Sequence, residues 1–160
     1  MLKAEDGASL SSGSIRLYYM LPSPPRRGGG GEAEAVAVGC IDLYSYDPLN
    51  RRAAVGIMVA TEHRRQGHAL AMLKKVEELF SGQWSVTSDQ CATQDKHTPL
   101  NTEHLTLNTN LHTLYADIAA TNTASIALFK KAGYEECGRF KEWLNVDGKF
   151  IDTVRMQKVL

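Results

Sequence analysis

Residues 59–69, VATEHRRQGHA, join an apolar segment to an amphipathic one, and this junction decides the fold. A strand is expected to end here and a helix to begin. A helix N-terminus leaves about four backbone N–H groups unpaired, and the helix dipole adds partial positive charge. Gly67 lets an anion approach the backbone, and the small Ala69 keeps the next position open. With Arg64 and Arg65 beside them, these groups predict a pyrophosphate cradle; a solvated, Arg-rich turn is the alternative.

The segments on both sides of this junction show clear periodicities. Residues 35–44 (AVAVGCIDLY) and 53–59 (AAVGIMV) are β-rich, and residues 45–52 between them contain Pro and Asn, which predicts an antiparallel hairpin. Residues 67–80 predict a helix, because apolar side chains recur there at steps of three and four. The apolar positions are Ala69, Leu70, Met72, Leu73, Val76, Leu79 and Phe80.

Farther along the chain, the pattern predicts a strand at 114–119 and a helix that is capped by Thr121 or Asn122. This helix runs to Ala132, with Gly133 as its natural terminator. Two strands follow, at 134–144 and 149–159, and Asp147-Gly148 between them is a hairpin signal. Together with a strand at 15–21, this order predicts an α/β fold with a mixed sheet.

Three segments fall outside this pattern. Residues 1–14 are small and polar and are expected to be poorly ordered. Residues 22–31 (PSPPRRGGGG) break both helix and strand. They are a flexible link or a hairpin tip, and the alternative is a phosphate loop without the usual Lys-Ser/Thr. Residues 83–110 are rich in Ser, Thr and Asn and predict an inserted polar loop.

Composition limits the classes of function. The chain has 160 residues, of which 18 are Lys or Arg and 18 are Asp or Glu, so the formal net charge is zero. This argues against a nucleic-acid partner. No apolar run is long enough to span a membrane, so no membrane partner is expected. The first residues do not resemble a secretory signal. Cys40, Cys91 and Cys137 are distant from one another, which favours a reducing, cytoplasmic setting.

A metal site is not expected. The candidate ligands are four residues whose spacing matches no standard zinc pattern: Cys91, His97, His104 and His112.

Two motifs resemble those of the GNAT acetyltransferase superfamily. Arg64-x-x-Gly67-x-Ala69 matches the family's Arg/Gln-x-x-Gly-x-Gly/Ala motif. Residues 122–134 resemble its second signature, Asn-x-x-Ser/Ala-x-x-Leu-Tyr/Phe-x-x-x-Gly-Phe. Residues 138–156 are similar to the spermidine and ribosomal-protein N-acetyltransferase branches. The resemblance covers residues 35–160.

The resemblance implies the GNAT acyl-CoA N-acyltransferase fold in a single domain over residues 1–160. The family usually places one strand and two helices before the strand matched by residues 15–21. Residues 1–14 are too few and too polar to supply them, so an N-terminally shortened domain is expected. Part of the sheet would then be uncovered, which predicts a homodimer.

The resemblance also implies acetyl-CoA as co-substrate, bound where the strands 53–59 and 114–119 run parallel and splay apart. The expected cofactor-binding residues are Ile57, Met58, Val59, Arg64, Arg65, Gln66, Gly67, His68, Ala69, Asn122, Ser125, Phe129 and Lys131. Of these, residues 57–59 would pair with pantetheine and residues 65–69 would bind the pyrophosphate. Phe129 would lie near the thioester, and Lys131 would meet the phosphates or the adenosine.

The catalytic groups are less clear, because direct transfer of an acetyl group to an amine needs a base and an acid. Many relatives carry Tyr at the position of Phe129, but Phe cannot donate a proton. Relatives also often carry Glu at the position of Ala54, and Ala cannot act as a base. Asp117, five residues before Asn122, stands where other members carry Glu and is predicted as the base; a solvent-facing strand residue is the alternative. Tyr134 is a second candidate or an aromatic core residue.

The sequence therefore predicts an N-acetyltransferase whose acceptor is a primary amine of a polyamine, a protein or a small metabolite. One alternative is a non-catalytic CoA-binding module, since Ala54 and Phe129 depart from the family pattern. Another is a nucleotide-phosphate binder that shares only the helix-start cradle.

Overall fold

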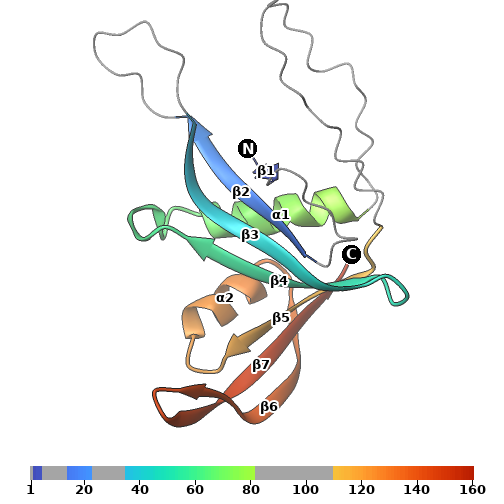
Figure 1. Cartoon of the computed structure of the whole chain (residues 1–160), viewed down its shortest axis with the longest axis vertical. Coiled ribbons are helices and arrows are strands. Elements are labelled where there is room, and N and C mark those ends of the chain that lie inside the picture. The colour runs from blue at the N-terminus through green and yellow to red at the C-terminus, as the bar shows by residue number, and fades with distance from the viewer. Residues whose placement is uncertain (1, 5–13, 23–34, 82–109) are drawn as a thin grey trace, which may run out of the picture.

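The order of strands and helices follows the prediction in the part of the chain that the computed structural model describes, which is residues 2–4, 14–22, 35–81 and 110–160. These residues form one seven-stranded sheet with two α-helices and a short 3-10 helix (Figure 1). The strands lie in the order β1-β2-β3-β4-β5-β7-β6. Their bounds are β1 Leu2–Ala4, β2 Ser14–Pro22, β3 Ala35–Asp47, β4 Arg52–Val59, β5 Thr113–Ala119, β6 Glu135–Val146 and β7 Lys149–Val159. The helices are η2 Thr61–His63, α1 His68–Phe80 and α2 Thr123–Lys131.

The parallel contact between β4 and β5 is short. It consists of three pairs, Arg52–Thr113, Ala53–Leu114 and Ala54–Tyr115, whereas the other neighbouring strands pair antiparallel. Beyond Ala54 the two strands part, and residues 55–59 and 116–119 form the two arms of what is called the fork below. The splay implied by the family resemblance is therefore present.

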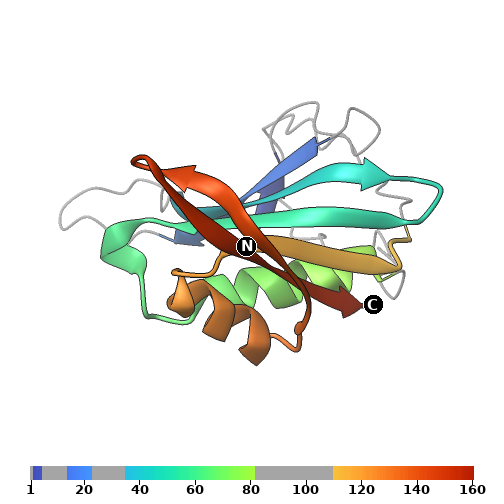
Figure 2. The ribbon, with the colours of Figure 1, turned by 90° about the horizontal axis from the view of Figure 1, so that it is seen from below.

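Both α-helices pack on the same face of the sheet, as Figure 2 shows. α1 buries Met72, Leu73, Val76 and Phe80 there. The sheet contributes alternate residues, because successive side chains of a strand point to opposite faces: Ile41, Leu43, Ala53, Val55, Leu114, Ala116, Val154 and Met156. The opposite face, called the far face below, carries the intervening residues. Within the described ranges no helix covers it.

The predicted turn chemistry is present. Asn122 caps α2 through its Oδ1, which accepts a hydrogen bond from the Ser125 N–H at 3.1 Å. Gly133 follows α2 with a φ of 89°. Asp147 and Gly148 join β6 to β7 with φ angles of 50° and 79°, as a tight hairpin turn requires. The element boundaries set by these residues were accurate to within about two residues, which is the usual margin.

Two predictions need correction. Strand β3 extends to Asp47, three residues beyond the predicted end at 44, because it continues to pair with β4 after an irregularity. Leu2–Ala4 was expected to be poorly ordered with the rest of residues 1–14. It forms β1 instead, because its backbone groups find partners on β2. Residues 1, 5–13, 23–34 and 82–109 lie outside the described residues, so the predictions for the glycine-rich link and the polar loop remain predictions.

Candidate cofactor site

A cavity of about 580 Å³ lies between β4, the start of α1 and α2. Its walls come from β4 and from the two segments that carry the motifs. β4 contributes Ile57, Met58 and Val59; the junction and α1 contribute His63, Arg64, Arg65, Gly67, His68, Ala69 and Leu70; α2 and its cap contribute Asn122, Ala124, Ser125, Leu128 and Lys131.

The start of α1 presents free backbone donors to this cavity. Gly67 is the N-cap with a φ of 87°, in the left-handed region that favours glycine. The first helical hydrogen bond runs from the Ala71 N–H to the Gly67 carbonyl at 3.0 Å. The N–H groups of His68 and Ala69 therefore have no helical partner. A Cβ at Gly67 would meet nothing within 4 Å, so the approach to these donors is open.

The charged side chains of the cavity wall are all positive. Arg64, Arg65 and Lys131 line it, and none of its described lining residues is Asp or Glu. Arg64 donates from Nε to the Val59 carbonyl at 3.0 Å, which folds it against the end of β4. Arg65 and Lys131 make no ion pair within the described ranges. In a chain of zero net charge, this concentration of cations and helix N–H donors fits an anionic ligand.

The β4 wall offers backbone groups to an extended ligand. On the side toward β5, pairing ends at Ala54, so residues 57–59 have no strand partner on that side. An extended chain can form hydrogen bonds with such an edge in place of a strand. Asn122 lines the opposite wall, and because its Oδ1 caps α2, its side-chain amide nitrogen is the group left to donate to a ligand.

Two predicted cofactor residues do not line the cavity. Phe129 is buried in the core, where its ring packs edge-on against Tyr134 with 4.9 Å between centroids. Its predicted place beside the thioester stays a prediction. The Gln66 side chain turns back to donate to the Glu62 carbonyl at 3.2 Å. The reason in both cases is that a motif fixes spacing along the chain but not the direction of each side chain.

Sequence reasoning missed four lining residues, His63, Leu70, Ala124 and Leu128. Helical spacing could have identified Leu128, which follows Ser125 by three positions and so shares its face. His63 had no such signal, because it comes from the short helix η2.

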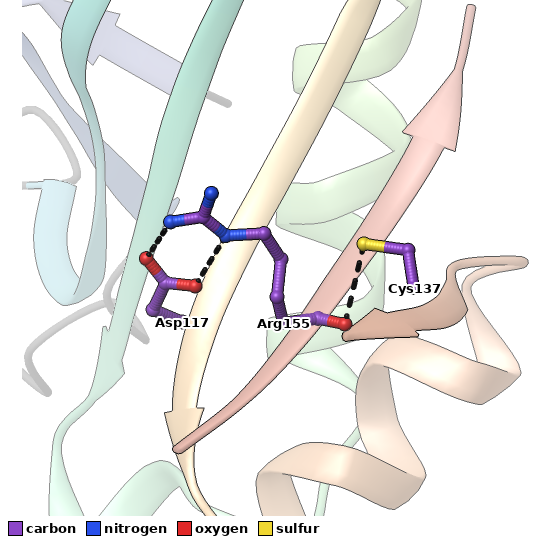
Figure 3. A network of polar contacts seen from close by, with 3 residues as sticks. All are labelled: Asp117, Cys137 and Arg155. Carbon is purple, nitrogen blue, oxygen red and sulfur yellow. Dashed lines mark hydrogen bonds and ion pairs between the residues drawn. The ribbon is translucent and has the colours of Figure 1, made fainter. Parts of the chain in front are cut away.

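Asp117, the predicted base, lies on the far face beside the fork. Its two oxygens accept hydrogen bonds from Nε and Nη2 of Arg155, both at 2.7 Å (Figure 3). The Arg155 guanidinium also lies over the rings of Tyr115 and Phe140, at 4.8 and 5.0 Å from their centroids. The hydrogen bond to Asp117 raises the pKa of Arg155. Each carboxylate oxygen keeps a second lone pair, so the role of Asp117 as a base stays a prediction.

Tyr134, the second candidate, is buried outside the cavity wall. Burial and the nearby Glu77 raise its pKa far above the ordinary value. Beside it, Lys158 donates to Glu77 at 2.6 Å and to the Ala132 carbonyl at 2.8 Å, which ties β7 to both helices. The surroundings of Tyr134 are those of a core residue.

The described residues contain no cluster of three or more His, Cys, Asp or Glu that could hold a metal ion. Within the same ranges, no helix is long and apolar enough to cross a membrane.

Comparison with known families identifies the class of protein. Residues 27–135 match the model of the acetyltransferase (GNAT) domain, which is more than half of the chain. The chain therefore belongs to the GNAT acetyltransferase domain family.

The relatives found are named as spermidine N-acetyltransferases. The chain is 22% identical over 125 residues to the spermidine N(1)-acetyltransferase of Vibrio cholerae, and the match spans 78% of this chain and 58% of that protein. Among solved structures, spermidine N-acetyltransferase from Vibrio cholerae in complex with CoA and spermine superposes with a TM-score of 0.63 at 19% identity, covering 93% of this chain and 67% of that one. A dodecameric structure of the same kind of enzyme gives 0.62 at 19% identity, covering 96% and 66%. These superpositions show that the fold is shared.

Proposed function

We propose that this chain is an acetyl-CoA-dependent N-acetyltransferase whose acceptor is a primary amine. The observation that carries the proposal is the cavity at the fork. It combines the unpaired edge of β4, the free N–H donors of α1 and a lining with three cations and no described carboxylate. CoA has the matching parts, which are an extended pantetheine arm and a pyrophosphate.

In the proposed complex, pantetheine pairs with the backbone of residues 57–59 and is met from the other side by Asn122 and Ser125. The pyrophosphate lies on the N–H groups of residues 65–69, with Arg65 and Lys131 supplying charge. The amine attacks the acetyl carbonyl directly, and a backbone N–H of β4 polarises that carbonyl. Asp117, on the far face, receives the amine proton through water.

The acceptor class is an amine that is free to approach the fork from the far face. The matched relatives are named for spermidine, so a polyamine is the first acceptor to test, ahead of peptide amines and small metabolites. We place the enzyme in the cytoplasm as a homodimer. The free thiol of Cys137 agrees with a reducing setting. Exposed aromatic side chains on the β6–β7 hairpin agree with self-association.

The test of this proposal is an assay of acetyl transfer to amines. Purified protein is incubated with acetyl-CoA and a panel of spermidine, spermine, a lysine-containing peptide and peptides with free N-termini. Thiol release is followed, and the acetylated product is identified by mass. The proposal predicts amine-dependent thiol release with a matching product. Tight binding of CoA without any product would instead support a non-catalytic CoA-binding module.

A pair of neighbouring lysines tests the site. Lys131 lines the cavity, whereas the adjacent Lys130 does not. Lys131→Met is expected to raise the Kd for acetyl-CoA about tenfold, the effect of losing one charge-assisted hydrogen bond. Lys130→Met should leave this Kd unchanged. Equal effects of the two variants would contradict the proposed place of the phosphates.

A further inference from the structure

The proposed reaction needs a proton donor for the departing thiolate, and Phe129 cannot be that donor. It has no acidic hydrogen and lies in the core, away from the cavity wall. The far face, however, places a phenol beside the fork. We propose that Tyr44 is the catalytic acid that protonates the CoA thiolate; this assignment rests on the proposed function.

The register of the sheet places Tyr44 at the fork. On β3, Tyr44 pairs with Ala54 of β4, and Ala54 makes the last parallel pair with Tyr115 of β5. Tyr44 is therefore one strand away from the point where β4 and β5 part.

The Tyr44 ring also leans along β4 toward the open arm of the fork. Gly56, two residues beyond Ala54, carries no side chain, and the Cε1 of Tyr44 lies 3.4 Å from the point that a Cβ of Gly56 would occupy. With pantetheine paired along residues 57–59, the thioester reaches the fork next to Gly56. The Tyr44 ring, which lies against Gly56, is then on the far face, from which the amine is proposed to approach.

The Tyr44 hydroxyl is available to a ligand. The side chain is 39% exposed, and its hydroxyl has no hydrogen-bond partner among the described residues. By contrast, the Tyr115 ring is covered by the guanidinium of Arg155, and Tyr134 is buried in the core.

The charges around Tyr44 keep the phenol protonated. Partial burial raises its pKa above 10, and the nearby Asp117, Tyr115 and Asp42 raise it further, while Arg155 opposes them. The two carboxylates are themselves paired, Asp117 with Arg155 and Asp42 with Arg16. At neutral pH the hydroxyl therefore carries the proton that a donor needs.

With Tyr44 and Asp117, every bond and every proton of the acetyl transfer is accounted for. The amine nitrogen forms a bond to the acetyl carbonyl carbon, the carbon–sulfur bond breaks, and its electron pair leaves with the sulfur. Tyr44 gives its hydroxyl proton to this sulfur. Asp117 takes the proton that the nitrogen releases and returns it through water to the Tyr44 phenolate. The products are the N-acetyl amine and CoA with a free thiol, and both side chains regain their starting states.

The test is Tyr44→Phe, which removes one oxygen from a partly exposed ring. Tyr46→Phe is the matched control, because Tyr46 lies on the same strand but packs against the core on the helix side. The kcat and KM are measured with acetyl-CoA and the best amine of the panel above, and the Kd for CoA is measured by calorimetry. Thermal unfolding checks that both variants are folded.

The expected result is a loss of about 100-fold or more in kcat for Tyr44→Phe. The Kd for CoA should stay within twofold of the wild type, and Tyr46→Phe should keep its activity. A Tyr44→Phe enzyme with kcat within threefold of the wild type would overturn the assignment, as would an equal loss in Tyr46→Phe. Absence of CoA binding or of transfer in the wild type would overturn the proposed function and this assignment with it.

Discussion

Gly67 is the residue on which the phosphate cradle depends most directly. Its φ of 87° is one that a residue with a Cβ adopts at a cost of roughly 1–2 kcal/mol. We predict that Gly67→Ala raises the Kd for acetyl-CoA severalfold, because the free N–H groups of α1 are shifted out of line. Calorimetric titration measures this change.

Gly148 supplies the control for Gly67. It has a similar φ of 79° and equally open surroundings, but it lies in the β6–β7 turn. Gly148→Ala should lower the melting temperature to a similar extent and leave the Kd unchanged. A Gly67→Ala protein that binds acetyl-CoA as tightly as the wild type would show that the cradle does not hold the pyrophosphate.

A second prediction concerns the Asp117 carboxylate. As the base, it should be essential in the step that deprotonates the amine, so Asp117→Asn is expected to lower kcat/KM about 100-fold. Asp42→Asn is the matched control, since Asp42 pairs in the same two-bond manner with Arg16 on the same face. An Asp117→Asn enzyme with unchanged kcat/KM across the pH range would remove Asp117 from the mechanism.

At the residue scale, prediction succeeded for residues whose position is fixed by the backbone geometry of a helix start. Gly67 at the start of α1 and Asn122 as the cap of α2 were identified because a helix start imposes fixed spacings on its cap and its open N–H groups. The burial of the Phe129 ring could not be predicted, because its inward or outward direction depends on the packing of α2 against Tyr134. Tyr44 was missed, because its closeness to the fork depends on the β3–β4 register and on Gly56, neither of which can be derived from spacing.

The turn between β3 and β4 is sensitive to acid through Asp47. Asp47 accepts hydrogen bonds from the backbone and side-chain nitrogens of Asn50 at 2.9 and 2.7 Å and pairs with Arg52 at 3.0 Å. The bonds from Asn50 lower the pKa of Asp47 below its ordinary value of 3.8. A group whose pKa is lower in the folded state stabilises that state above its unfolded pKa, and this contribution is lost as the pH falls through the folded pKa.

We therefore predict that Asp47→Asn lowers the melting temperature slightly at pH 7, and that the difference from the wild type vanishes below the folded pKa of Asp47. Thermal unfolding of both proteins between pH 7 and pH 2 measures the difference. A gap that stays constant over this range would show that the Asp47 carboxylate does not stabilise the turn.

At the scale of elements, most of the fold could be predicted because each element has its own local signal. Three local signals were each readable without the rest of the chain. They are the alternation of apolar and polar residues in β3 and β4, the apolar face of α1, and the Asp147-Gly148 turn. β1 could not be predicted, because three residues form a strand only when a neighbour such as β2 offers its edge. The fork itself came from the family resemblance, since strand pairing across distant segments leaves no local pattern.

The whole molecule presents an apolar surface on its last hairpin. Trp143 is 64% and Phe150 is 63% exposed. Side chains of this size at the surface are typical of contacts between proteins. In the proposed homodimer, this hairpin is the contact surface.

We predict that the wild type sediments as a dimer at micromolar concentration and that Trp143→Ser with Phe150→Ser sediments as a monomer. Leu49→Ser is the control, because Leu49 is 89% exposed but lies on the other hairpin. A wild type that sediments as a stable monomer would contradict the homodimer, and a dimer that survives the double substitution would place the contact elsewhere.

The most direct test of the central claim is thermal unfolding of the wild type alone and with acetyl-CoA, CoA or ATP at matched concentrations. A ligand at about 100 times its Kd adds roughly 2.7 kcal/mol to the stability of the folded state. The account predicts a clear rise in melting temperature with acetyl-CoA and with CoA, and none with ATP. An equal rise with ATP, or no rise with any of the three, would contradict it.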